Sequence, residues 1–306
     1  MKTSKSNLSF VFPGQGSQKI GMLREFSSEE TVRVTFSEAS EVLGYDVWAL
    51  IQEGDPSAIN LTIRTQPILL CCSLALWRLW SVRGGRIPDY LGGHSLGEWS
   101  ALVCAEVISF KDALSVVEER GLLMQSAVPE GEGAMAAVIG LQDQAVLECC
   151  EQAQTGGMVS AVNFNAPGQI VIAGAAKSVN KAIYLCKKAG AKRTILLPVS
   201  APFHTMMMRP AADSLTQRLE NISFSCPKIP VIHNVHGRFE DNPEGIKAAV
   251  LKQIYSPVLW VQCVERLLNE GTNVFVECGA GGVLSGLIRR IDKTIQAYTL
   301  STSESF

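Results

Sequence analysis

The sequence lacks the residue spacing of a metal site or a redox centre. It has nine cysteines and four histidines, but no C-x-x-C motif and no arrangement of these residues at metal-ligand spacing. Most cysteines lie in apolar runs, including the pairs Cys71-Cys72 and Cys149-Cys150, as small core residues do. We therefore expect reduced thiols, no metal ion or other cofactor, and a cytoplasmic location.

The chain also lacks a long hydrophobic run and an excess of charge of one sign. Its longest apolar stretch, Ile68 to Trp77, is too short to span a membrane. The run from Phe10 to Phe12 ends at Pro13-Gly14, too early for the hydrophobic region of a signal peptide. A net charge of -2, without a basic stripe, would attract nucleic acid weakly. We expect a soluble protein that binds neither membranes nor nucleic acid.

The sequence contains enough apolar residues to form a large buried core. It has 306 residues, of which 47% are hydrophobic and 18% charged, as in folded globular proteins. Apolar periodicity predicts helices over residues 31–50, 66–82, 98–105, 210–219, 246–254 and 261–269, with a last helix ending at Arg290. A further helix opens at Ser109, a candidate N-cap. Short strands are predicted at 8–12, 88–92, 231–234 and 274–277.

A different order of elements is predicted between residues 130 and 200. Strands at 133–141, 159–165, 169–174 and 192–199 alternate with helices at 143–153 and 177–189. The order β-α-β-β-α-β is that of ferredoxin-like folds. We therefore predict a ferredoxin-like small subdomain, residues 130–200, inserted into a core domain made of residues 1–129 and 201–306.

The segment Gly93-His94-Ser95-Leu96-Gly97 fits the pattern G-x-S-x-G. In that pattern the glycines permit a sharp turn from strand to helix, which exposes the serine hydroxyl at the helix N-terminus. Unpaired N–H groups and the helix dipole would there favour an anion. The alternative is an ordinary glycine-rich turn whose serine caps a helix. The pentapeptide alone leaves both interpretations open.

A second glycine-rich loop, Pro13 to Gln18, follows the first predicted strand. The dinucleotide-binding pattern G-x-G-x-x-G would need a glycine where Lys19 stands, so that interpretation fails. The loop remains a good place for exposed backbone N–H groups.

A serine nucleophile needs a base, and the four histidines are the candidates. His94 adjoins the serine on a tight turn, where neighbouring side chains point apart, so we expect a structural role. His204 follows the last strand of the predicted subdomain; it is either the general base or a histidine satisfied by a neighbouring carbonyl. His233 and His236 are interpreted as surface or core residues with turn roles.

Arg120 lies on a helix with an apolar face, where burial of a cation is costly without a partner. Its planar guanidinium could bind a substrate carboxylate through two parallel hydrogen bonds. The alternative is a salt bridge to Glu118, Glu119 or another acid.

Six segments together resemble one family. They are Phe12 to Gln18, Gly93 to Glu98, Arg120-Gly121, Asn163 to Gln169, Phe203-His204 and Gln253 to Val258. In this order they are similar to motifs of the malonyl-CoA:acyl carrier protein transacylases, and the likeness runs from residue 8 to residue 290. It implies an α/β fold with an α/β-hydrolase-like core and the inserted subdomain, with the active site between them.

The resemblance also implies roles for individual residues. Ser95 would be the nucleophile and His204 the base, oriented by the backbone carbonyl of Gln253. The N–H groups of Gln15 and Leu96 would form the oxyanion hole. In the substrate site, Arg120 would bind the malonyl carboxylate, with Phe203 and Asn163 beside it. The expected reaction is ping-pong transfer from malonyl-CoA to acyl carrier protein, feeding fatty acid synthesis, with coenzyme A released.

Two other functions stay open at this stage. The first is a serine hydrolase or thioesterase on the same core, with Asp112 or Asp143 as the third member of a triad. The second is a non-catalytic module that binds acyl carrier protein.

Overall fold

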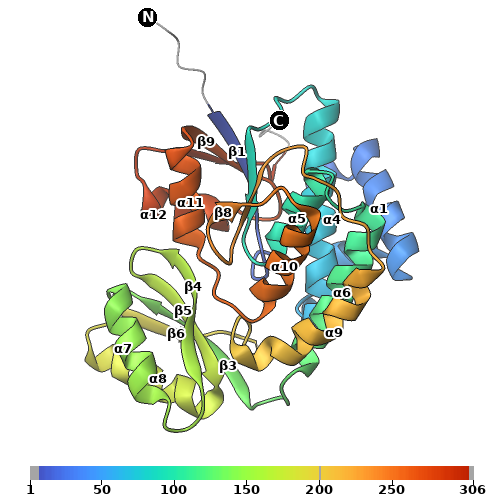
Figure 1. Ribbon diagram of the computed structural model, residues 1–306. Helices are drawn as coiled ribbons and strands as arrows, with labels where there is room; N and C mark the ends of the chain where they lie inside the picture. The colour runs from blue at the N-terminus through green and yellow to red at the C-terminus, as the bar shows by residue number, and fades with distance from the viewer. Residues whose placement is uncertain (1–6, 200, 303–306) are drawn as a thin grey trace, which may run out of the picture.

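The computed structural model describes residues 7–199 and 201–302, which form a mixed α/β structure with two sheets (Figure 1). Ser200, at the predicted domain boundary, and residues 1–6 and 303–306, at the predicted ends of the core domain, lie outside the described residues. No helix among the described residues is long and apolar enough to cross a membrane.

The larger sheet has the strand order β10-β9-β1-β2-β7-β8. All of its pairs are parallel except that of β7 with β8. The carboxyl ends of the parallel strands therefore meet at one edge, where ligands bind in open α/β sheets. The strands are β1 (Asn7–Phe12), β2 (Tyr90–Gly93), β7 (Val231–His233), β8 (Arg238–Phe239), β9 (Thr272–Glu277) and β10 (Gln296–Thr299).

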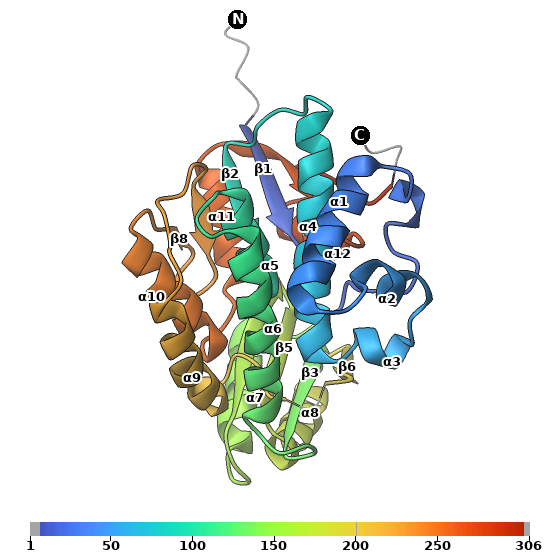
Figure 2. The ribbon, with the colours of Figure 1, turned by 90° about the vertical axis from the view of Figure 1, so that its right-hand side faces the viewer.

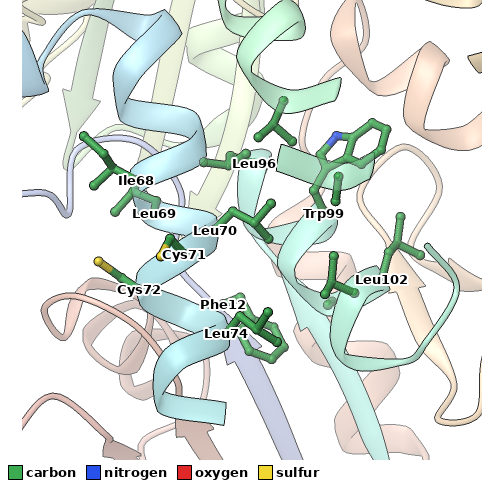
Figure 3. Packing of buried hydrophobic residues seen from close by; sticks show 14 of the residues in the cluster. Phe12, Ile68, Leu69, Leu70, Cys71, Cys72, Leu74, Leu96, Trp99 and Leu102 are labelled. Carbon is green, nitrogen blue, oxygen red and sulfur yellow. The ribbon is translucent and has the colours of Figure 1, made fainter. Parts of the chain in front are cut away.

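Helices cover both faces of this sheet because the side chains of β1 alternate between the faces. Phe10 and Phe12 belong to a core cluster with residues of α1 (Glu30–Leu43), α4 (Thr62–Val82), α5 (Leu96–Cys104) and α6 (Phe110–Ser126), some of which are drawn in Figure 3. Val11 belongs to a second cluster with residues of α11 (Trp260–Asn269) and α12 (Val283–Ile291). Figure 2 shows α1, α4 and α5 on the side that faces the viewer.

The helices associated with the larger sheet come from both halves of the chain. They are α1 (Glu30–Leu43), α2 (Val47–Glu53), α3 (Pro56–Ile59), α4 (Thr62–Val82), α5 (Leu96–Cys104), α6 (Phe110–Ser126), α9 (Arg209–Glu220), α10 (Pro243–Ile254), α11 (Trp260–Asn269) and α12 (Val283–Ile291), with short 3-10 helices at Arg24–Phe26 and Met206–Met208.

The second sheet is antiparallel, with the strand order β4-β5-β3-β6. The elements follow the predicted β-α-β-β-α-β order: β3 (Gly133–Ile139), α7 (Asp143–Ala153), β4 (Val159–Ala166), β5 (Gln169–Ala175), α8 (Ala176–Lys188) and β6 (Arg193–Leu196). Residues of α7 and α8 form a separate core with one face of this sheet. Met135, Val171 and Ala173 on the other face join the main core, so the two sheets pack as one structure.

Backbone hydrogen bonds at Val258 also join the antiparallel sheet to the segment between α10 and α11. The N–H of Phe164 in β4 donates to the oxygen of Val258 at 3.0 Å, and the N–H of Val258 donates to the oxygen of Val162 at 2.8 Å. This connection holds β4 beside the segment that joins α10 to α11, and hence near the site described below.

The prediction of one helix over residues 31–50 is wrong. Gly44 ends α1 in the left-handed conformation (φ 73°), and the Asp46 side chain accepts from the N–H of Ala49 to cap α2. The helix predicted from residue 66 begins at Thr62 and contains Pro67 in its second turn. Ser109 caps α6, as predicted. The edge strands β8 and β10 were not predicted, because two to four residues give little periodicity.

Candidate active site

Ser95 stands at the sharp turn between β2 and α5. Its backbone has φ 53° and ψ -108°, a conformation that residues other than glycine rarely adopt. A β-carbon on Gly93 would lie 1.9 Å from the carbonyl carbon of Gly97, and one on Gly97 would lie 1.9 Å from the oxygen of Phe12. The turn therefore needs glycine at both positions. These are the first and last residues of the G-x-S-x-G pattern.

The turn brings Ser95 next to His204. The serine Oγ lies 2.7 Å from Nε2 of His204, although 109 residues separate the two along the chain. On the other side of the ring, Nδ1 lies 2.8 Å from the main-chain oxygen of Gln253. A carbonyl oxygen can only accept, so Nδ1 carries the proton and Nε2 is left to accept from the serine hydroxyl.

His204 is buried, and its backbone also has a positive φ, 63°. Burial and then the positive charge of Arg120 lower the pKa of His204 from 6.5 to about 3. The imidazole is therefore neutral at neutral pH, which is the form a general base requires.

The loop after β1 packs against the serine turn. A β-carbon on Gly14 would lie 2.5 Å from the oxygen of His94, so the two segments touch through their backbones. Gln15 of this loop and Leu96 line the same pocket as Ser95. Leu96 is the first residue of α5, where N–H groups have no intrahelical acceptor. These are the two residues that the family resemblance implies for an oxyanion hole.

Arg120 is 1% exposed and directs its guanidinium at the pocket from α6. Nη1 donates to Oε1 of Gln66 at 2.6 Å, and Nη2 donates to Oε1 of Gln253 at 2.9 Å. Nε has no hydrogen-bond partner among the described residues. Burial lowers the pKa of Arg120 to about 10, so the group stays charged at neutral pH.

Among residues 7–199 and 201–302, Arg120 forms none of the alternative salt bridges. Glu118 pairs with Arg64 at 3.1 Å, and Glu119 pairs with Arg218 at 3.4 Å. Arg120 is held by neutral amide oxygens instead. Its positive charge is thus available to a carboxylate that enters the pocket.

The pocket has a volume of about 100 Å³ and is lined by residues attached to both sheets. Met135 of β3 and Asn163 of β4 contribute from the antiparallel sheet, and Phe203 from the segment that returns to the larger one. The buried Oδ1 of Asn163 has no hydrogen-bond partner among the described residues. Nε2 of His94 lies 2.8 Å from Oδ1 of Asn165.

Three residues near the site were not identified from the sequence. Glu98, His233 and Asn234 are fully buried and hydrogen-bonded to one another. His233 is a core residue, one of the two alternatives predicted, and its oxygen accepts from the N–H of Gly237 in the turn that follows. The prediction did not include the contact of its Nδ1 with Oε1 of Glu98, at 2.7 Å. The one available signal was the acid three residues after Ser95, in an otherwise apolar helix turn.

The acids considered for a hydrolase triad lie elsewhere. Asp112 accepts from the Ser109 hydroxyl at the start of α6, and Asp143 is the first residue of α7. The position beside Nδ1 of His204 is occupied by the oxygen of Gln253. Among the described residues, no group of three or more His, Cys, Asp or Glu side chains could hold a metal ion.

Residues 9–300 match the family described as acyl transferase domain. The chain is 50% identical to the malonyl CoA-acyl carrier protein transacylase of Escherichia coli K12, over 97% of this chain and 96% of that protein. It is 42% identical to the protein of that name from Bacillus subtilis strain 168, over 98% and 95%.

Two solved structures are similar over almost the whole chain. One is an acyl carrier protein S-malonyltransferase from Vibrio cholerae, with a TM-score of 0.96, 52% identity and 98% of each chain covered. The other is a malonyl-transacylase in complex with its type II PKS acyl-carrier protein, with a TM-score of 0.97 and 48% identity over 98% and 97% of the chains.

Proposed function

The chain belongs to the acyl transferase domain family, and we propose that it carries the malonyl group on Ser95 during transfer. It transfers malonyl from malonyl-CoA to acyl carrier protein, the reaction named for relatives that are 50% identical over 97% of its length. The observation that carries the serine proposal is the 2.7 Å contact between Ser95 Oγ and a neutral His204, in a pocket that also holds Arg120.

In the first half-reaction, Nε2 of His204 takes the hydroxyl proton while Ser95 Oγ attacks the thioester carbon of malonyl-CoA. The carbonyl oxygen becomes an oxyanion, which the N–H groups of Gln15 and Leu96 stabilise. The carbon–sulfur bond then breaks, and His204 returns the proton to the sulfur of coenzyme A. The product is malonyl-Ser95.

In the second half-reaction, the phosphopantetheine thiol of acyl carrier protein gives its proton to His204 and attacks the ester. Collapse of the tetrahedral intermediate releases Ser95 Oγ, which recovers the proton. The second half repeats the first in reverse, so one base and one oxyanion hole serve both.

Arg120 provides the choice of acyl group. Its buried charge gains a partner when a malonyl carboxylate enters and has none when an acetyl group does, and an unpaired charge in a closed site is costly. Phe203 and Asn163 line the same pocket. In our proposal the Phe203 ring limits its size, and the side-chain amide of Asn163 hydrogen-bonds the malonyl group.

We also propose the finer architecture. The strand order β4-β5-β3-β6, with α7 and α8 on one face, supports a ferredoxin-like subdomain over residues 130–200. The parallel strands and the serine turn support an α/β-hydrolase-like core over the remainder. Nine free cysteines, eight of them buried, support a location in the cytoplasm.

The transfer assay uses malonyl-CoA, holo acyl carrier protein and the purified chain. We expect malonyl to accumulate on the phosphopantetheine thiol, at a rate that greatly exceeds release of free malonate, and neither product with Ser95→Ala. Equal rates of malonate release and transfer would favour the hydrolase instead. Transfer by Ser95→Ala at the wild-type rate would contradict the covalent route.

A further inference from the structure

Glu98 is a carboxylate with 0% exposure, one turn into α5 after Ser95. Its Oε1 lies 2.7 Å from Nδ1 of His233, and its Oε2 accepts from the N–H of Asn234 at 2.9 Å and from Nε2 of Gln253 at 2.8 Å. Such a group is stable in a core only when its oxygens are hydrogen-bonded, as they are here. Its place near the N-terminus of α5 is also favourable, because the helix dipole is positive there.

Two of these donors, Gln253 and Asn234, hold the groups that react. The main-chain oxygen of Gln253 orients His204, and its side-chain oxygen accepts from Arg120. Oδ1 of Asn234 accepts from the N–H of Ser95 at 2.7 Å.

The serine turn itself is held on both sides. Nε2 of Gln253 also donates to the oxygen of Ser95 at 3.0 Å, and Nδ2 of Asn234 donates to the oxygen of Gly93 at 2.7 Å. These bonds fix a serine backbone whose φ of 53° is unfavourable by itself.

We propose that Glu98 is a positioning residue for the acylation of Ser95. It fixes Gln253 and Asn234, and through them the base and the strained serine turn. The inference rests on the proposed roles of Ser95 and His204. Glu98 accepts from the side-chain amide of Gln253, and the main-chain oxygen of Gln253 accepts from Nδ1 of His204. Glu98 is therefore linked to the imidazole through one residue and two hydrogen bonds.

Two substitutions at Glu98 separate its hydrogen bonds from its size and charge. Glu98→Gln can keep all three contacts: the amide oxygen accepts from Asn234 and Gln253, and the amide nitrogen donates to His233 once that imidazole carries its proton on Nε2. Glu98→Met has a similar volume but no comparable acceptor, so the three donors lose their bonds to this side chain, and Nε2 of Gln253 keeps its bond to the oxygen of Ser95.

A matched control is available in Glu277, the carboxylate at the end of β9. It is also 0% exposed, and its Oε2 accepts from the N–H of Ser285 at the start of α12, outside the network described above. Glu277→Gln therefore reports the effect of neutralising a buried carboxylate elsewhere in the core.

Two rates are measured for each variant, with a melting curve to establish folding. The first is the formation of malonyl-Ser95 from malonyl-CoA, followed by intact mass. The second is the reaction of Ser95 with a fluorophosphonate, in which Oγ attacks phosphorus, fluoride leaves and His204 takes the proton. The second reaction needs the activated serine but no site for malonyl.

We expect Glu98→Gln and Glu277→Gln to react with the fluorophosphonate near the wild-type rate. Glu98→Met should lose about tenfold to a hundredfold in both reactions, as expected for losing hydrogen bonds to a charged group. Glu98→Asp, which keeps the charge but withdraws the acceptors by one methylene, should also react more slowly.

A wild-type rate for Glu98→Met would overturn the proposal, and so would an equal loss in Glu98→Gln and Glu98→Met. If Glu98→Met does not fold, the rates of Glu98→Asp and Glu98→Gln are compared instead. Wild-type rates for both of these variants would overturn the proposal. If the wild type reacts with the fluorophosphonate but not with malonyl-CoA, the proposed function is contradicted. The role of Glu98 in positioning Ser95 and His204 is then still tested by the fluorophosphonate rates of the variants.

Discussion

Nη2 of Arg120 donates a 2.9 Å hydrogen bond to the side-chain oxygen of Gln253, the residue whose main-chain oxygen lies 2.8 Å from Nδ1 of His204. One residue thus contacts both the cation that we expect to select the acyl group and the imidazole that we expect to act as base. A displacement of Arg120 would therefore change the position of His204 as well as the shape of the pocket. We therefore expect acyl-group selectivity and reaction rate to be linked in this site.

Replacement of Arg120 by alanine should reverse the acyl preference. Malonyl transfer should fall by about a hundredfold, because a charge-assisted pair of hydrogen bonds to the carboxylate is lost. Acetyl transfer should gain relative to malonyl transfer. The measurement is the ratio of kcat/KM for malonyl-CoA and acetyl-CoA.

Arg64→Ala is the control for this substitution, since Arg64 pairs with Glu118 and does not line the pocket. It should leave the ratio unchanged. An unchanged ratio in Arg120→Ala itself would remove Arg120 from the account of selectivity.

The pH dependence of acylation should show no titration of an ordinary histidine. Because burial and Arg120 lower the pKa of His204 to about 3, the base stays neutral throughout the range from about pH 5 to 8. The quantity to measure is kcat/KM for malonyl-Ser95 formation, which reports the free enzyme. A fall in acid with a midpoint near 6.5 would show that the base is not held as described.

The same shift affects stability. Below pH 6.5 the unfolded chain binds a proton at His204, whereas the folded chain does so only near pH 3. The contribution of this group to the free energy of unfolding therefore falls as the pH is lowered through that window. Urea unfolding of the wild type and of His204→Gln at pH 5 and pH 7 should show the larger acid loss in the wild type, and equal losses would contradict the shift.

The packing of the serine turn can be tested at Gly97. Gly97→Ala places a β-carbon 1.9 Å from the oxygen of Phe12, a backbone atom that cannot move away cheaply. We expect a loss of about 3 kcal/mol or more in the free energy of unfolding, since such overpacking is at the costly end of core substitutions. Urea denaturation measures it.

Gly286 provides the opposite case within the same protein. It lies inside α12, and a β-carbon added to it would meet none of the neighbouring atoms within 4 Å. Gly286→Ala should stabilise the chain by about 0.5–1 kcal/mol through helix propensity. Similar effects of the two substitutions would mean that the close approach at Gly97 is not as described.

Local sequence features predicted much of the fold. The β-α-β-β-α-β order from Gly133 to Leu196 and the N-cap at Ser109 depend on neighbouring residues, and the structure confirms them. The break between α1 and α2 was missed even though Gly44 and Asp46 are local signals, because apolar spacing continued across them. Capping residues mark a helix boundary that apolar periodicity does not show.

The interior of the site could not be predicted in the same way. Glu98 and His233 meet across 135 residues, and Gln253 reaches Glu98 across 155. Such contacts depend on which strands become neighbours in the sheet, and no local pattern encodes that. The proximity of Ser95 and His204 was inferred through family resemblance, and the structure places them in contact; their catalytic roles stay predictions.

The most direct test of the account is the intact mass of the protein after brief incubation with malonyl-CoA. We predict a gain of one malonyl group on the wild type, no gain on Ser95→Ala, and little gain when acetyl-CoA replaces malonyl-CoA. Peptide mapping should place the group on Ser95. Release of coenzyme A by the wild type without any covalent adduct, or an adduct that persists in Ser95→Ala, would contradict it.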